Sequence, residues 1–160
     1  MDQQAPLYDR DFFEWTQREA AKLRAGQAAR VNLDLDFENL AEEVESMGRG
    51  QLRALESALA RVVEHLLKLE FSPSEQPRRL WGVSVRIHRQ NAQGELDQSP
   101  SLHRRARLSV VYRSAILLVE ESFIQHGEAV PEFPVECPYT LDQILDDGFL
   151  PANRHGLTDR

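Results

Sequence analysis

The sequence predicts an all-α fold, organised as a helical bundle of four main helices plus a short C-terminal helix. Apolar residues recur about every 3.6 positions over long stretches, which is typical of amphipathic helices. No second segment with strand-like alternation is present to complete a sheet. With 160 residues, 41% of them hydrophobic and 28% charged, the chain has the size and composition of one globular domain. We therefore expect a single domain over residues 1–160, with an ordered core over about 8–151.

The first helix is expected over residues 9–25. Phe12, Trp15 and Leu23 follow a loose helical period, and Gly26 stands where glycine commonly ends a helix. An aspartate near the start complements the partial positive charge of a helix N-terminus.

The longest apolar stripe predicts a helix over residues 36–70, ended by Pro73. Gly48 and Gly50 interrupt it, and each costs up to about 1 kcal/mol in a helix interior. The apolar residues before and after these glycines nevertheless keep nearly the same helical phase. This favours one long helix that can kink at Gly48, while two helices with a turn at the glycines stay an open alternative.

Residues 74–93 carry two conflicting signals. Apolar residues alternate as in a strand at Trp81, Val83, Val85 and Ile87. Two helical stripes also run through the segment, one with Leu80, Val83 and Ile87 and the other with Trp81, Val85 and His88. Because a lone strand is not stable, we expect a helix with two partly buried faces, broken at Gly94.

Capping signals place the remaining elements. Ser99 followed by Pro100 is a strong helix start, and Thr140 with Gln143 forms a capping box. We expect a helix over 100–126, an extended loop over 128–139, a short helix over 141–146 and a frayed tail after Pro151.

The charge of the chain is distributed by segment. The net charge is −7, which argues against the whole chain being a nucleic-acid binder. The stretch 71–114 is basic, with a net charge of +5, and all its positive charges are arginines. These arginines could bind phosphate, nucleic acid or an acidic partner, or neutralise the acidic helices beside them.

The sequence points to the cytoplasm. The single cysteine, Cys137, cannot form an internal disulfide, which suits a reducing compartment. The N-terminus lacks the basic and apolar regions of a signal peptide. No apolar run approaches the roughly 20 residues that span a bilayer, so no membrane partner is expected.

Two groups of residues are candidate sites. The first is a polar site of Glu42, Glu43, His65 and Lys68. On one straight helix Glu43 and His65 would lie roughly 33 Å apart along the axis, so they could share a metal only if the chain folds back at Gly48 and Gly50 or across a dimer. No metal site is predicted. The second is a binding surface of Trp81, Arg78, Arg86 and Arg89, because aromatic residues and arginine are enriched at binding hot spots.

Five blocks of the chain, YDRDFFEWT, LAEEVESMGR, HLLKLEFSP, SPSL and ECPYTLDQILDDGFLP, occur in this order from Tyr8 to Pro151. Together they resemble the bacterial family catalogued as domain of unknown function 29. The resemblance implies an all-α bacterial domain and no known activity. It also implies recurrent polar residues at Glu42, Glu43, His65 and Lys68, with Trp81 and Arg89 in the middle segment.

Three hypotheses about function follow. The favoured one is a non-enzymatic interaction or regulatory protein that forms a homo-oligomer or binds a protein partner. The second is a metal-dependent or hydrolytic enzyme that uses Glu42, Glu43 and His65. The third is a protein that binds nucleic acid or an acidic partner through residues 78–107. Nothing in the sequence identifies a cofactor.

Overall fold

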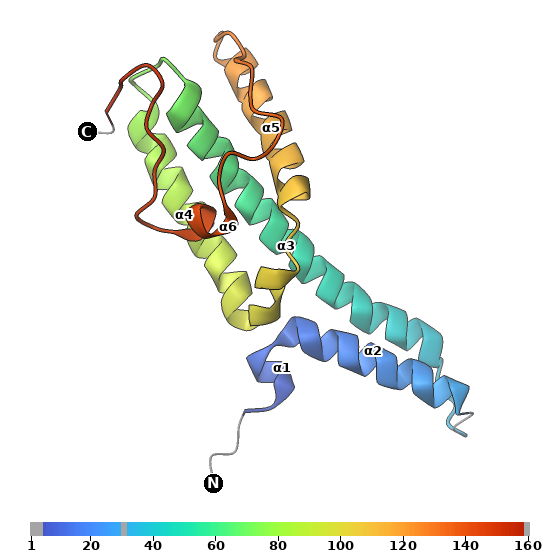
Figure 1. The fold of residues 1–160 in the computed structure, drawn as a ribbon. Helices are drawn as coiled ribbons and strands as arrows, with labels where there is room; N and C mark the ends of the chain where they lie inside the picture. The colour runs from blue at the N-terminus through green and yellow to red at the C-terminus, as the bar shows by residue number, and fades with distance from the viewer. Residues whose placement is uncertain (1–4, 30–31, 159–160) are drawn as a thin grey trace. The chain divides into compact units, whose positions relative to one another are not determined.

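The computed structural model describes residues 5–29 and 32–158, and all regular secondary structure in these residues is helical (Figure 1). This confirms the all-α prediction. The elements are α1 (Leu7–Arg10), α2 (Phe12–Ala28), α3 (Phe37–Phe71), α4 (Arg78–Gln98), the 3-10 helix η1 (Pro100–Arg104), α5 (Leu108–Gln125) and α6 (Leu141–Leu145). None of these helices combines the length and the apolar composition needed to cross a membrane.

The chain divides into two compact units, and each is described by itself. The first unit comprises Met1–Leu55 and Gly94–Ala106, and the second comprises Glu56–Gln93 and Arg107–Arg160. Both α3 and α4 contribute to both units. The single domain over residues 1–160 stays a prediction.

The long helix α3 is continuous through both glycines, so the prediction of one helix over residues 36–70 is confirmed. Gly48 is buried against α2, and a Cβ atom there would lie too close to the hydroxyl of Thr16 and against the ring of Phe13. Gly50 is exposed, and a Cβ atom there would meet nothing within 4 Å. Gly48 therefore allows two helices to approach closely, and neither glycine marks a turn.

We expect Gly48→Ala to lower the free energy of unfolding by about 1–3 kcal/mol, because overpacking outweighs the gain in helix propensity. The hydroxyl of Thr16 cannot move away freely, since this fully buried residue donates a hydrogen bond to the Phe13 carbonyl at 2.7 Å. Gly50→Ala is the matched control and should stabilise the protein by about 0.5–1 kcal/mol. Urea unfolding of both variants tests this, and stabilisation by both would contradict it.

The sequence predicts one helix over residues 9–25. The structure has two helices here, α1 and α2, because Asp11 interrupts the helical backbone. Asp11 is extended, and its carboxylate accepts a hydrogen bond from the backbone N–H of Glu14 at 2.9 Å, which caps α2. The same carboxylate accepts hydrogen bonds from the backbone N–H and the hydroxyl of Ser101. This aspartate thereby joins the start of α2 to η1.

The predicted break at Gly94 was wrong, since α4 continues to Gln98. Gly94 is exposed, while Ala92 and Leu96 on either side of it are buried. A single exposed glycine costs only about 1 kcal/mol in a helix, which the packing of its neighbours can offset.

The predicted helix start at Ser99 was also wrong, because Pro100 begins only the short 3-10 helix η1. The Ser99 hydroxyl does not cap η1. It accepts a hydrogen bond from the backbone N–H of Phe13 at 2.8 Å and donates one to Gln51 at 2.6 Å. The α-helix instead begins at Leu108, after Arg107.

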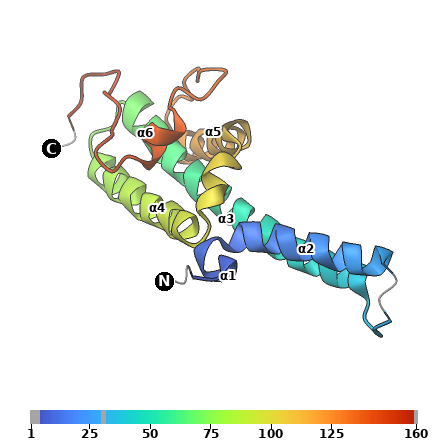
Figure 2. The same ribbon diagram turned by 60° about the horizontal axis from the view of Figure 1, so that its bottom comes forward.

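The core of the second unit forms where α3 lies between α4 and α5 (Figures 1 and 2). Its fully buried side chains include Leu59, Val62, Val63, Leu66, Leu67, Val85, Val111, Ala115, Val119 and Ile144. The helix predicted over 74–93 is confirmed, but its expected second buried face is not. Val85 and Ala92 are buried, whereas Leu80, Val83 and Ile87 are exposed.

The tail after Pro151, expected to fray, is instead bonded to the C-terminal end of α3. The side-chain amide of Asn153 donates hydrogen bonds to the carbonyls of Leu69, Glu70 and Ser72 at 2.8, 3.3 and 3.0 Å. Arg154 forms a 3.0 Å ion pair with Glu70. The tail satisfies carbonyl groups that every helix C-terminus leaves without intrahelical donors.

Candidate functional site

The acidic residues of the predicted polar site, Glu42 and Glu43, lie in the first unit, where Glu42 and the neighbouring Glu45 form ion pairs with arginines. Arg24 of α2 lies 2.8 Å from Glu45 and 3.7 Å from Glu42. Arg49 lies 2.5 Å from Glu42. The hydrogen bond from Arg24 holds the pKa of Glu45 below its ordinary value. Glu43 is exposed. This arrangement is the arginine-paired acidic face of two adjacent helices.

The other two residues of the predicted polar site, His65 and Lys68, lie together in the second unit around a buried carboxylate. Lys68 Nζ lies 2.6 Å from Glu64, and the two side chains are only 9% and 5% exposed. Arg61 adds a third charge at 3.0 Å from Glu64. Burial opposes ionisation of Glu64, but the hydrogen bonds from Lys68 and Arg61 outweigh it, so its pKa is lowered.

A pair of histidines borders this buried ion pair. The rings of His65 and His88 lie 5.6 Å apart, and His65 Nδ1 is 2.8 Å from the Arg61 carbonyl oxygen. Burial is the main cause that lowers the pKa of both histidines. Among the described residues, no group of three or more His, Cys, Asp or Glu side chains is arranged to hold a metal ion.

We expect the free energy of unfolding to fall as the pH drops below 6.5. In this range the unfolded chain binds protons at His65 and His88 before the folded chain does, because their folded pKa values lie below the ordinary 6.5. A second, lower step of loss should begin below 4.5, where the unfolded chain binds a proton at Glu64 before the folded chain does, because the folded pKa of Glu64 is lowered. Urea unfolding at a series of pH values measures this, with His65→Gln/His88→Gln as the variant that should flatten the upper step. An unchanged upper step in that variant would contradict the assignment.

Trp81 is half-buried and shares a small pocket with Lys68. The pocket holds about 10 Å³, enough for roughly one water molecule. Glu128 borders the pocket and accepts hydrogen bonds from the hydroxyls of Ser72 and Ser74. This pocket is too small for a substrate.

The three arginines of the predicted binding surface occupy different environments. Arg78 and Arg89 are each 3% exposed. Arg78 donates to the Leu69 carbonyl at 3.0 Å. The guanidinium of Arg89 donates to the carbonyls of Ile144, Gln143 and Phe149, at 2.8, 3.1 and 2.8 Å. Arg86 is exposed. Two of these arginines therefore bind the chain's own backbone, and only Arg86 faces solvent.

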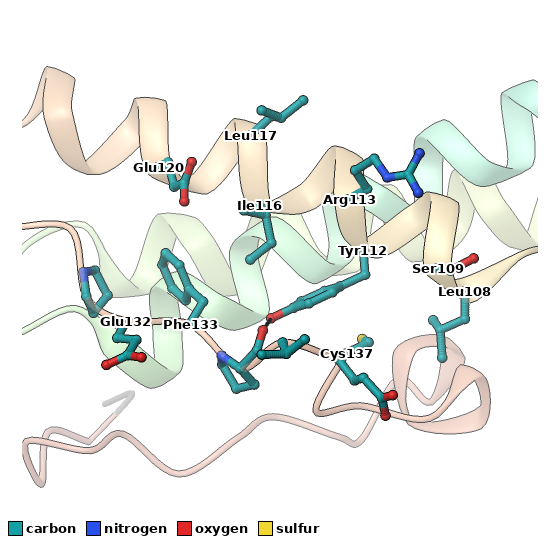
Figure 3. Close-up of a pocket in the computed structure, with 14 residues that line it drawn as sticks. Leu108, Ser109, Tyr112, Arg113, Ile116, Leu117, Glu120, Glu132, Phe133 and Cys137 are labelled. Carbon is teal, nitrogen blue, oxygen red and sulfur yellow. Dashed lines mark hydrogen bonds between the residues drawn. The ribbon is translucent and has the colours of Figure 1, made fainter.

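A groove of about 840 Å³ lies in the second unit (Figure 3). We call it the α5 groove. It lies between α5 and the loop over residues 131–137, and is lined by Leu108, Ser109, Tyr112, Arg113, Ile116, Leu117, Glu120, Pro131, Glu132, Phe133, Pro134, Val135, Glu136 and Cys137. Its volume is in the range of pockets that bind small ligands.

Tyr112 and Ile116 point from α5 toward the loop, whereas Leu117 points away from it (Figure 3). The Tyr112 hydroxyl donates a 2.6 Å hydrogen bond to the Pro134 carbonyl, which fixes the loop against α5. Burial raises the pKa of Tyr112 to about 12 and also raises that of the Cys137 thiol. The groove therefore has no activated nucleophile among these two groups. It does have apolar side chains in solvent, with Leu117 67% and Val135 99% exposed.

Sequence reasoning missed both Glu64 and the α5 groove. Glu64 and Lys68 stand four residues apart inside an apolar run, which is a detectable signal for a buried ion pair. Leu117 lies off the buried stripe of α5, and Val135 is an apolar residue between prolines. Those two positions could have indicated an exposed apolar surface.

A sequence comparison identifies the family. Residues 7–150 match the family described as "Domain of unknown function DUF29". The chain belongs to this family. Membership of DUF29 confirms the resemblance seen in the sequence blocks and assigns no activity.

A solved structure supports the same fold for this DUF29 chain. It is the crystal structure of an α-helical protein of unknown function from Rhodospirillum rubrum, with a TM-score of 0.76 and 29% sequence identity. The alignment covers 91% of this chain and 93% of that one. No curated protein sequence shows significant similarity to the chain.

Proposed function

We propose that this DUF29 chain is a non-enzymatic protein-interaction module that binds a protein partner in the α5 groove. The observation that carries the proposal is a large, preformed groove whose lining exposes Leu117 and Val135 to solvent. Apolar patches of this kind on a folded protein commonly mark binding sites. The hydrogen bond from Tyr112 to Pro134 supports the proposal, because a pre-ordered loop loses less entropy on binding.

The candidate catalytic groups favour this reading over an enzyme. Glu42 is paired with arginines, and Lys68 is paired with Glu64 inside the second unit. The cavity that Lys68 and Trp81 border has room for about one water molecule. These contacts indicate structural roles for the polar residues.

The arginine contacts likewise favour protein binding over nucleic-acid binding. Arg78 and Arg89 bind backbone carbonyls, and Arg107 is paired with Glu56 at 2.8 Å. These three side chains are therefore already engaged within the second unit. We also place the protein in the bacterial cytoplasm, a proposal supported by the free thiol of Cys137 and by the bacterial source of the similar structure.

Site-specific photo-crosslinking in cells tests the proposed function. A photoreactive phenylalanine analogue is introduced at Val135 or Leu117, and at the exposed Arg104 of the first unit as the control position. We expect crosslinked protein species from the two groove positions and none from position 104. Absence of crosslinks at both groove positions, or equal crosslinking at position 104, would overturn the proposal.

A further inference from the structure

The second unit exposes a second apolar surface, on α4, which we call the α4 strip. It consists of Leu80, Val83 and Ile87, which are 68%, 41% and 49% exposed. Their spacing of three and four residues places them along one side of the helix. This is the pattern by which an amphipathic helix enters an apolar groove.

The α4 strip is flanked by positive charge. Arg79 and Arg86 are both exposed and stand seven residues apart, so they lie on the same side of α4. Neither forms an ion pair with any residue that the structure describes. The strip thus combines apolar side chains with two guanidinium groups that lack carboxylate partners in the described part of the chain.

The α5 groove carries the complementary charge. Its lining includes three carboxylates, Glu120, Glu132 and Glu136, and one cation, Arg113. Within residues 5–29 and 32–158, none of these four side chains is in an ion pair. The groove is therefore apolar with an excess of negative charge, and the strip is apolar with an excess of positive charge.

The lengths of the two surfaces are compatible. The strip from Leu80 to Ile87 extends roughly 10 Å along α4, at 1.5 Å per residue. The α5 side of the groove runs from Leu108 to Glu120, which is roughly 18 Å by the same measure. The strip is therefore shorter than the α5 side of the groove.

We infer that the partner bound in the α5 groove is a second copy of this chain, which inserts its α4 strip. This inference rests on the proposed function and names its partner. Burial of Leu80, Val83 and Ile87 against Ile116, Leu117 and Val135 removes apolar surface from water on both sides. Arg79 and Arg86 then lie beside the groove carboxylates. This charge complementarity favours the contact of a strip with a groove over contacts between two grooves or between two strips. Because the two surfaces differ, each contact joins the strip of one copy to the groove of another. Two such contacts made reciprocally give a dimer, and successive contacts give a ring or an open chain of copies.

Sedimentation velocity of the full chain over a series of concentrations tests the inference. Arg79→Glu/Arg86→Glu and Glu132→Arg/Glu136→Arg should each weaken self-association by about tenfold or more, since each brings like charges together. The chain with all four substitutions should regain association, and so should an equimolar mixture of the two double variants. Arg10→Glu/Arg104→Glu reverses two exposed arginines of the first unit and serves as the matched control. Association of the wild type should weaken with added salt.

A monomeric wild type, or association that the strip and groove variants leave unchanged, would overturn the inference. Failure of the four-fold variant and of the mixture to associate would overturn it as well, because charge complementarity would then not decide the contact. In each of these cases crosslinks from Val135 to a different protein would leave the proposed function standing. If neither groove position gives a crosslinked protein, the proposed function is overturned as well.

Discussion

Lys68→Ala is expected to lower the free energy of unfolding by about 3 kcal/mol, because it leaves the Glu64 carboxylate buried without its closest cation. Lys68 and Glu64 are 2.6 Å apart and almost fully buried. Arg61 lies 3.0 Å from Glu64 but is 47% exposed, so it should compensate only in part. Urea unfolding measures the effect, and the slope of the free energy of unfolding against urea concentration should stay unchanged.

The double variant Glu64→Met/Lys68→Met is the control for this prediction. It removes both charges at once, and replacing a whole buried ion pair with apolar residues of similar volume is often neutral or stabilising. We expect it to recover most of the stability that Lys68→Ala loses. A loss below about 1 kcal/mol in Lys68→Ala would show that the pair is effectively solvated.

Arg89→Met is expected to lower the free energy of unfolding by about 3 kcal/mol. Hydrogen bonds from a charged group contribute about 1.5–3 kcal/mol each and are not additive. Arg89 donates to three carbonyls, two of them in α6, and these would lose a donor in the interior of the second unit. Hydrogen exchange over residues 141–150 should increase, because this segment is bonded to α4 through Arg89.

Gln90→Met is the matched control, since Gln90 lies on the same helix but is exposed and belongs to neither the α4 strip nor the α5 groove. Its effect should stay within about 0.5 kcal/mol, as for most surface substitutions. Equal effects of the two substitutions would contradict the structural role assigned to Arg89. Arg89→Lys should be nearly as destabilising as Arg89→Met, because a lysine cannot reach three carbonyls with one fork of donors.

The helices were largely predictable because their apolar periods are long. In α3 the stripe keeps its phase through Gly48, so continuity could be inferred before the packing against Thr16 was known. The helix boundaries that were predicted wrongly depend on contacts between residues that are far apart in the sequence. Asp11 caps α2 while binding Ser101, and the Ser99 hydroxyl binds Phe13 and Gln51. No local pattern contains such information.

The candidate site was less predictable. Residue types and the family resemblance indicated Lys68, Trp81 and Arg89 as candidate site residues. They could not indicate whether a charged side chain faces solvent or a backbone carbonyl. The exposure of Leu80, Val83 and Ile87 is equally hidden, because an apolar stripe looks the same in sequence whether another element covers it or not. The α5 groove depends on how an irregular loop folds against α5, which the proline pattern does not specify.

The contacts of Asn153 and Arg154 show that the end of the family match and the end of the bonded structure lie at different residues. Similarity to the family ends at residue 150, yet the last carbonyls of α3 obtain their donors from residues beyond it. A chain shortened to the matched region would expose these carbonyls and remove the positive charge of Arg154 from the negative end of the helix dipole. The matched region therefore ends before the residues whose side chains complete the hydrogen bonding at the C-terminal end of α3.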